Sequence, residues 1–160
     1  MNIILVYPRW NYPTFGQLQE PLGLLHIGAM LKAHGDTVKF FDLAVDAIER
    51  LDEALADADL VCISSSTVLF GRACRVLNRI KKKCPSLPVV LGGPHATLLP
   101  EDAVMRGFDA AVIGEGEYTA IDLVEAIGLV LAFLVEAESP RHPQRIDVLS
   151  ELDLDLRFRP

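Results

Sequence analysis

Five short, mostly apolar runs divide the chain, and each predicts a buried β-strand. The runs cover residues 3–7, 37–41, 60–63, 89–91 and 110–113. Strands that are apolar at nearly every position are covered on both faces, which is typical of parallel sheets. The pattern therefore predicts a parallel sheet between two layers of helices.

Patterns with a helical period fill the intervals between these runs. The predicted helices cover residues 21–34, 45–56, 68–83, 98–106 and 118–127. Pro21 stands in the first turn of the first helix, and Gly35 and Gly107 follow the ends of two helices, where glycine is common. Strands that alternate with helices through right-handed crossovers predict an α/β fold. We expect a doubly wound, five-stranded parallel sheet that is flavodoxin-like, or Rossmann-like, in strand order.

The pattern beyond Gly128 has two interpretations. Residues 129–135 could prolong the last helix, or they could form a strand that returns, after a turn at Pro140 and Pro143, along residues 145–148. We prefer this C-terminal hairpin because Gly128 is a good helix stop. The predicted domain then covers residues 1–138, and residues 139–160 form a hairpin arm or a linker.

Composition limits the classes of function. A length of 160 residues, 51% of them hydrophobic, suffices for one compact core, and the net charge of −7 argues against nucleic acid as a partner. The longest apolar run, residues 126–135, is about half of the roughly 20 residues that a membrane span needs. The N-terminus has the pattern of a strand and not of a signal peptide, so we expect a cytoplasmic protein without a membrane span.

Two further groups of residues have simple explanations. A basic run from Arg72 to Lys83 is typical of a solvated helix face, with docking of a phosphate or a neighbouring domain as the alternative. Cys62, Cys74 and Cys84 lack CxxC spacing, which argues against a disulfide framework or a zinc site, so no metal ligand is expected.

Four loops at one edge of the predicted sheet carry the candidate chemistry. Ligands of open parallel sheets lie over the carboxyl ends of the strands, and the loops that follow those ends are rich in glycine or hydroxyl groups. Besides residues 8–20, the candidate binding residues are Ser64, Ser65, Ser66, Thr67, Gly92, Gly93, Pro94, His95, Thr97, Gly114, Glu115, Gly116, Glu117 and Thr119.

Each of these residues also has a structural explanation. Serine and threonine cap helices, glycines make turns, and Glu115 and Glu117 could complement a helix N-terminus. His95 alone would more often be a packing residue, and we expect His26, in an apolar helical stripe, to be a core residue. The concentration of unusual loops on one edge favours a ligand site.

In combination and order, several motifs resemble the N-terminal cobalamin-binding domain of B12-dependent radical SAM enzymes. That family includes anaerobic magnesium-protoporphyrin ester cyclases and methyltransferases. The resemblance runs from about residue 2 to residue 124. The motifs are Pro21-Leu22-Gly23-Leu24-Leu25, His34-Gly35, Phe41-Asp42, Ser64-Ser65-Ser66-Thr67, Gly92-Gly93-Pro94-His95-Ala96-Thr97 and Gly114-Glu115-Gly116-Glu117.

The resemblance implies that cobalamin is the ligand. Gly92 and Gly93 would leave room for the broad corrin ring and for the nucleotide tail that passes beside the sheet. The turn of residues 64–67 would hydrogen-bond the tail or the corrin amides, and residues 114–117 with Thr119 would border the ring. No catalytic residue is expected in this chain.

The sequence departs from related patterns in two places. Residues 8–20 contain no histidine, so this loop cannot supply an imidazole ligand to cobalt. The cysteines do not form the Cx3CxxC arrangement that holds a [4Fe–4S] cluster. S-adenosylmethionine and the cluster would therefore belong to a radical SAM barrel domain, present in cis or in trans. The tail Leu152-Asp153-Leu154-Asp155-Leu156 resembles the linker that precedes such a barrel.

Two other functions remain open. One is a flavodoxin-like nucleotide-binding or regulatory module without B12, although Tyr7-Pro8 and Ser64-Ser65 stand where a receiver domain needs acids. The other is a hydrolase or transferase that uses residues 64–67 and His95, which lacks a visible third partner. A homodimer through residues 129–135 is also left open.

Overall fold

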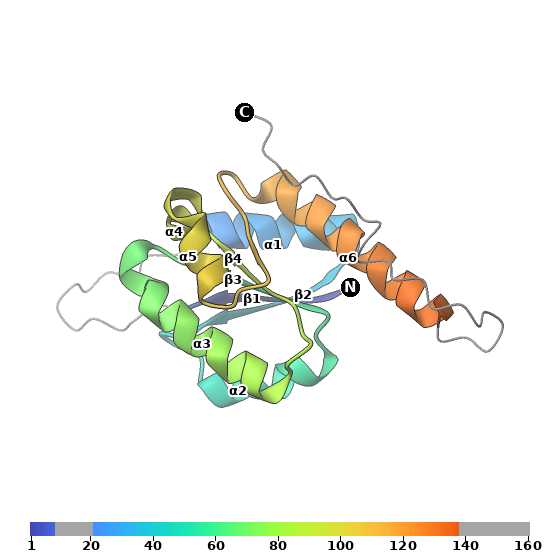
Figure 1. Ribbon diagram of the computed structural model, residues 1–160, viewed down its shortest axis with the longest axis horizontal. Helices are drawn as coiled ribbons and strands as arrows, with labels where there is room; N and C mark the ends of the chain where they lie inside the picture. Colours follow the sequence, from blue (N-terminus) through green and yellow to red (C-terminus); the bar gives the residue numbers. More distant parts are fainter. Residues whose placement is uncertain (9–20, 138–160) are drawn as a thin grey trace. The chain divides into compact units, whose positions relative to one another are not determined.

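A computed structural model of the protein describes residues 1–8 and 21–137 (Figure 1). The sheet has five parallel strands in the order β2-β1-β3-β4-β5. The strands are β1 (Asn2–Tyr7), β2 (Thr37–Asp42), β3 (Leu60–Ser64), β4 (Val89–Gly92) and β5 (Ala110–Ala111). The predicted α/β fold with flavodoxin-like strand order is confirmed.

The register of the sheet places the candidate loops side by side. Ser64, the last residue of β3, aligns with Gly92, the last residue of β4. β5 is shorter than the predicted run 110–113 because the chain turns at Gly114, which has a φ of 75°. Val112 still donates its backbone N–H to the Leu91 carbonyl, at 2.8 Å. The loops after β3, β4 and β5 therefore leave the sheet at one edge.

Helices cover both faces of the sheet (Figure 1). On one face, α2 (Ile48–Ala54) and α3 (Phe70–Lys83) bury an apolar core against the strands. On the other face lie α1 (Leu22–His34) and the first turns of α6 (Glu117–Ala137). Strand residues alternate between these faces, so Val61 and Ile63 belong to the first core while Cys62 points to the opposite side.

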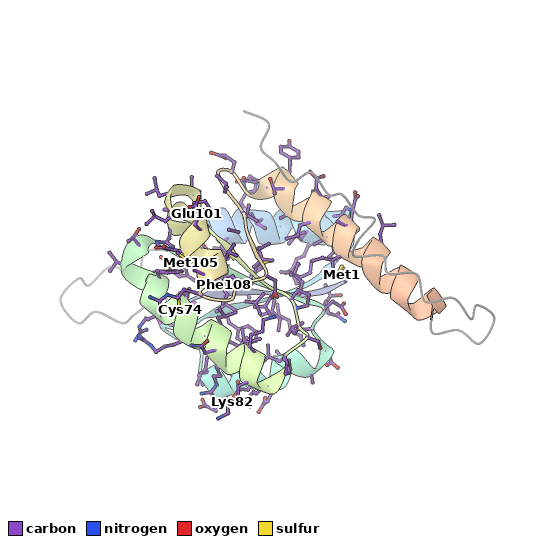
Figure 2. The ribbon with its side chains drawn as sticks, viewed as in Figure 1. Met1, Cys74, Lys82, Glu101, Met105 and Phe108 are labelled. Carbon is purple, nitrogen blue, oxygen red and sulfur yellow. The ribbon has the colours of Figure 1, made fainter. Side chains whose placement is uncertain are left out.

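The predicted helix 98–106 is two short helices instead. α4 (Pro94–Leu98) and α5 (Pro100–Met105) are separated by Leu99, whose backbone is not helical, with φ −140° and ψ 61°. Proline lacks the N–H that a continuing helix needs and disfavours a helical conformation in the preceding residue, so Pro100 starts a new helix. Phe108 follows α5 and is buried, whereas Met105 on α5 is exposed (Figure 2).

Two other helices begin later than predicted. The predicted helix 45–56 begins at Ile48, because Asp42 and Asp46 form a hydrogen-bonded turn before it, and it ends in a 3₁₀ turn, η1 (Leu55–Asp57). The predicted helix 68–83 begins as a 3₁₀ turn, η2 (Thr67–Leu69), that leads into α3.

The preferred C-terminal hairpin is wrong in its first strand, because α6 continues through Gly128 to Ala137. Glycine inside a helix costs only about 1 kcal/mol relative to alanine, and the leucines and alanines that follow are good helix formers. The return strand 145–148 lies outside the described residues. Internal contacts group the chain into two units, Met1–Glu125, which holds the whole sheet, and Ala126–Pro160. The domain boundary after residue 138 stays a prediction.

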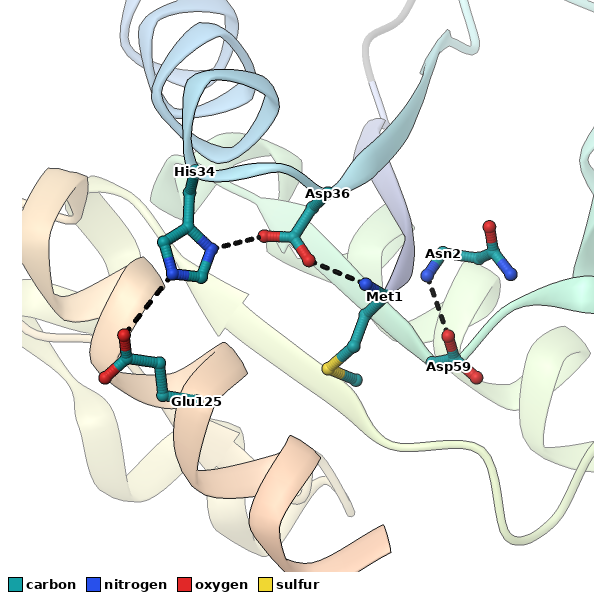
Figure 3. Close-up of polar contacts among 6 residues, drawn as sticks. All are labelled: Met1, Asn2, His34, Asp36, Asp59 and Glu125. Atoms are coloured by element: carbon teal, nitrogen blue, oxygen red, sulfur yellow. Dashed lines mark hydrogen bonds and ion pairs between the residues drawn. The ribbon is translucent and has the colours of Figure 1, made fainter. Parts of the chain in front are cut away.

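The edge of the sheet opposite the candidate loops is closed by polar contacts (Figure 3). The Met1 ammonium group donates to Asp36 at 2.7 Å, and Asp36 accepts from His34 at 2.8 Å. The other His34 ring nitrogen lies 3.3 Å from the Glu125 carboxylate on α6. These contacts join β1, the turn before β2, and α6 at the amino ends of the strands.

Part of the predicted basic run is paired with acids of the same chain. Arg79 on α3 donates two hydrogen bonds to Asp52 on α2, at 2.9 and 2.6 Å, and Lys83 lies 3.0 Å from the same carboxylate. Lys81 pairs with Asp109 at 2.7 Å, whereas Lys82 is exposed on the outer side of α3 (Figure 2). Helix α3 therefore presents a charged face on which several basic side chains form ion pairs with acids of the same chain.

Candidate functional site

The turns after β3 and β4 are joined by backbone hydrogen bonds. Ser65 donates its N–H to the Gly92 carbonyl at 3.0 Å, and His95 donates its N–H to the Ser65 carbonyl at 2.9 Å. These bonds extend the pairing of β3 and β4 beyond the strand ends. Residues 64–67 and 92–97 therefore act as one structural unit.

The two neighbouring glycines of this unit have different roles. Gly93 has a φ of 88°, and a Cβ there would lie 2.7 Å from Ser64 Oγ and 3.1 Å from the Ser65 backbone. Only glycine allows the two turns to approach so closely. A Cβ on Gly92 would meet no atom within 4 Å, although Gly92 lines a cavity. Because Gly92 has no side chain, the part of the cavity next to it stays empty.

The loop after β5 is tied to the same unit. The Gly114 N–H donates to Thr97 Oγ1 at 3.0 Å, and the Thr97 hydroxyl donates to the Gly93 carbonyl at 3.2 Å. A Cβ on Gly116 would lie 2.9 Å from Ile27 Cδ1, so this loop also packs closely on α1. Three of the four predicted loops therefore surround one space, whereas residues 9–20 of the fourth loop lie outside the described residues.

That space is a cavity of about 790 Å³. Its floor is formed by side chains of three strands or the residues after them, Cys62, Val90 and Val112. Its walls come from α1 and from the first turns of α6, and they are mostly apolar: Leu22, Leu24, Ile27, Ala120 and Leu123. A space of this size, apolar inside and polar at its rim, is typical of a small-molecule or cofactor site.

Ten of the fourteen predicted binding residues line the cavity. They are Ser64, Ser66, Gly92, Gly93, Pro94, Thr97, Gly114, Glu115, Gly116 and Glu117. The other four, Ser65, Thr67, His95 and Thr119, are not among the lining residues. Ser65 is fully buried and its hydroxyl donates to the Ser66 carbonyl at 2.8 Å. The Thr119 hydroxyl donates to the Glu115 carbonyl at 3.5 Å.

The sequence interpretation missed the floor and the walls of the cavity. It considered loops, whereas Cys62 comes from β3, Val112 directly follows β5, and Ile27 and Leu123 come from helices. Strand alternation was the available signal, because Cys62 lies between Val61 and Ile63, which belong to the core on the opposite face.

Charged and titratable groups are concentrated at the rim. Burial raises the pKa of the Cys62 thiol to about 12, so the floor of the cavity is neutral at physiological pH.

Glu117 lies 3.4 Å from His26 Nδ1, and the His26 side chain is 64% exposed, so the prediction that His26 is a core residue is wrong. In helix α1 this histidine occupies the solvent side, facing α6.

The described residues carry neither a metal-binding cluster nor a membrane-spanning helix. Residues 1–8 and 21–137 contain no group of three or more histidines, cysteines or acids that could hold a metal ion. Within the same ranges, no helix combines the length and the apolar character needed to cross a membrane.

The fold and the cavity together define a class of protein, a flavodoxin-like α/β domain with a ligand cavity at the carboxyl edge of its sheet. Residues 12–124 match the B12 binding domain family. The chain belongs to this family, and the resemblance that its motifs indicated is confirmed.

The relatives are longer proteins. The chain is 35% identical over 137 residues to an uncharacterized methyltransferase of Pyrococcus horikoshii, covering 79% of this chain and 29% of the relative. It is 29% identical over 139 residues to the anaerobic magnesium-protoporphyrin IX monomethyl ester cyclase of Rubrivivax gelatinosus, covering 79% of this chain and 24% of the relative. The chain therefore spans less than a third of the length of these relatives.

A solved structure supports the fold. The non-phosphorylated receiver domain of the stress response regulator RcsB from Escherichia coli aligns with a TM-score of 0.52 and 20% identity, covering 82% of this chain and 93% of that domain. At this level of identity the likeness shows the fold alone.

Proposed function

We propose that this domain binds cobalamin, with the nucleotide tail in the cavity and the corrin ring over the carboxyl edge of the sheet. The observation that carries the proposal is the apolar cavity beside Gly92. Gly92 lies on the same face of β4 as Val90, both residues line the cavity, and a Cβ added at Gly92 would meet no atom within 4 Å. The tail combines an apolar base with a polar ribose and phosphate, and the cavity combines an apolar floor with hydroxyl groups at its rim. The family of the chain supports the same ligand.

The lining residues have distinct roles in this proposal. Cys62, Val90 and Val112 present an apolar surface to the base, and Ser64 and Ser66 offer hydroxyl groups to the polar part of the tail. Glu115 and Glu117 stand at the rim, where carboxylates can accept hydrogen bonds from corrin amides. Bound cobalamin supplies a cobalt centre that can carry and transfer a methyl group.

The chain does not offer an imidazole ligand to cobalt from the expected place. Residues 8–20 contain no histidine, and in the described part of the chain no histidine lines the cavity. His95 is buried behind the cavity wall, and His26 faces Glu117. We infer that the domain holds cobalamin through its tail and corrin periphery.

The chemistry of the whole protein is a further part of the proposal. Relatives carry names of methyltransferases and of a cyclase, and they extend far beyond the matched region. We infer that a radical SAM barrel, with S-adenosylmethionine and a [4Fe–4S] cluster, acts with this domain in the cytoplasm. The cysteine spacing of the chain supports placing the cluster elsewhere.

A matched pair of variants tests the proposed site. Gly92→Leu fills the cavity, whereas Gly71→Leu places the same side chain on the exposed start of α3, where no atom lies within 4 Å of an added Cβ. We expect Gly92→Leu to weaken hydroxocobalamin binding at least about tenfold in equilibrium dialysis, a loss of roughly 1.4 kcal/mol. Gly71→Leu should bind like the wild type.

The competing function is a nucleotide-binding or regulatory module without B12. Wild-type protein that is folded by circular dichroism but binds FMN, or no chromophore, would favour this alternative. Equal cobalamin affinity of both variants would place the ligand outside the cavity.

A further inference from the structure

His95 lies behind the wall of the cavity and touches the turns that form it. Its side chain is 2% exposed, and its ring stacks on Phe70 with the centroids 3.7 Å apart. Nδ1 lies 3.3 Å from the Thr67 hydroxyl, in the turn that follows β3. The histidine therefore links α4, the serine turn and the first residue of α3.

The second ring nitrogen of His95 has no hydrogen-bond partner although it is buried. The nearest ionic group is the Asp102 carboxylate of α5, with an Nε2 to Oδ2 distance of 3.9 Å. In the tautomer that carries its proton on Nε2, this proton faces the carboxylate and Nδ1 accepts a hydrogen bond from the Thr67 hydroxyl. A phenylalanine would fill the same space and stack equally well, so packing alone does not explain a histidine here.

The backbone of the same residue already holds the serine turn. The His95 N–H donates to the Ser65 carbonyl at 2.9 Å, and the Ser65 N–H donates to the Gly92 carbonyl at 3.0 Å. The side chain adds a second connection two residues further along that turn, at Thr67. Ser64 and Ser66, which line the cavity, lie on either side of the residue held by the backbone.

The geometry assigns His95 as a positioning residue of the cavity wall. Through Thr67 and Ser65 it fixes the serine turn against the glycine turn, and thereby holds Ser64 and Ser66 at the cavity. Its effect on ligand affinity rests on the proposed function, since cobalamin is the ligand whose tail would meet these serines. His95 itself makes no contact with the cavity.

Three variants separate the hydrogen bond from the packing. His95→Phe keeps the stack on Phe70 but removes both nitrogens, and Thr67→Val removes only the hydroxyl. His95→Asn places an amide near the position of Nδ1 and restores the contact with Thr67. The matched control is Thr37→Val, an exposed threonine at the start of β2, at the opposite edge of the sheet.

The first measurement needs no ligand. We expect amide hydrogen exchange at Ser65 and His95 to accelerate at least about threefold in His95→Phe and Thr67→Val, as a lost hydrogen bond of ordinary strength implies. Exchange in the interior strand β1 should stay unchanged, and His95→Asn should return the two amides toward wild-type rates. Unchanged exchange in both variants would overturn the assignment, whether or not the protein binds cobalamin.

The second measurement is hydroxocobalamin affinity. We expect roughly three- to tenfold weaker binding for His95→Phe and for Thr67→Val, and a double variant no weaker than either single variant, because one contact is removed. Thr37→Val should bind like the wild type. Wild-type affinity in both single variants would overturn the positioning role, whereas a wild-type protein that binds no cobalamin would contradict the proposed function instead.

Discussion

Adjacent glycines at the end of β4 show how one residue type serves two purposes. Gly93 is required by the fold, because its φ is 88° and an added Cβ would strike the turn after β3. Gly92 has an ordinary backbone and open space before it. The sequence identified both glycines as important, but it could not distinguish a tight turn from an emptied cavity, because the difference depends on neighbours from another strand.

This difference predicts a large effect of alanine at Gly93 and a small effect at Gly92. Gly93→Ala should lower the free energy of unfolding by about 2 kcal/mol through backbone strain and the clash with Ser64. Gly92→Ala should change it by less than about 0.5 kcal/mol. Urea unfolding followed by circular dichroism measures both values. Equal destabilisation by the two substitutions would show that Gly92 is also a structural requirement.

At the scale of elements, α2 and α3 are joined by Asp52. The hydrogen bonds from Arg79 lower the pKa of Asp52, against the opposing effect of burial, and Lys83 adds to the lowering. The Asp52 side chain is 12% exposed, whereas Glu49, 3.9 Å from Arg79, is 71% exposed. Because Asp52 is mostly buried and Glu49 is exposed, the effects of substituting the two acids on stability can be compared directly.

We expect Asp52→Asn to lower the free energy of unfolding by about 0.5–1 kcal/mol at pH 7, the range of a partly exposed bidentate ion pair. Glu49→Gln should change it by less than about 0.3 kcal/mol. The contribution of Asp52 is present above its unfolded-state pKa and is lost as the pH falls through the lowered folded-state pKa. If the two variants show the same loss in urea unfolding at pH 7, this pair does not stabilise the contact.

A second connection between elements depends on pH. Hydrogen bonds with Asp36 and Glu125 raise the pKa of His34 above its ordinary value of 6.5. Burial tends to raise the pKa of Asp36, but contacts with the Met1 ammonium and His34 outweigh this effect and lower it. The contacts therefore favour protonated His34 beside two carboxylates.

The sign of the pH effect follows from these shifts. The contribution of His34 is fully present below pH 6.5, its unfolded-state pKa, and is lost as the pH rises through its raised folded-state pKa. We expect the thermal unfolding midpoint of the wild type to fall relative to that of His34→Gln between pH 6 and pH 8, as measured by circular dichroism. A difference between the two proteins that stays constant over this interval would contradict the account.

The sequence predicted the kinds of element better than their ends. All five strands lie where apolar runs indicated them, because burial on both faces leaves a continuous signal. Pro100 divides the helix expected at 98–106, and Gly128 does not end α6. A proline changes the backbone locally whatever its context, whereas the effect of a glycine depends on the residues that follow it.

At the scale of the molecule, the two ends of the parallel strands differ. Polar contacts close the amino ends, and the cavity lies at the carboxyl ends. The amino ends of the strands are closed by the contacts of Met1, Asp36 and His34 (Figure 3). The carboxyl ends open into the cavity through three of the four loops that the sequence identified. The loops were predictable because strand ends of a parallel sheet share an edge. The depth of the cavity could not be predicted, because it arises where helix and strand side chains from distant segments meet.

The central claim is that this domain alone forms a cobalamin site in its cavity. The most direct measurement is gel filtration of the purified protein with excess hydroxocobalamin, with absorbance followed in the protein and corrin bands. We expect one cobalamin to elute with each wild-type chain, with shifted corrin bands, and Gly92→Leu to carry clearly less cobalamin than Gly71→Leu, which should match the wild type. Folded wild-type protein that elutes without corrin absorbance would contradict the claim.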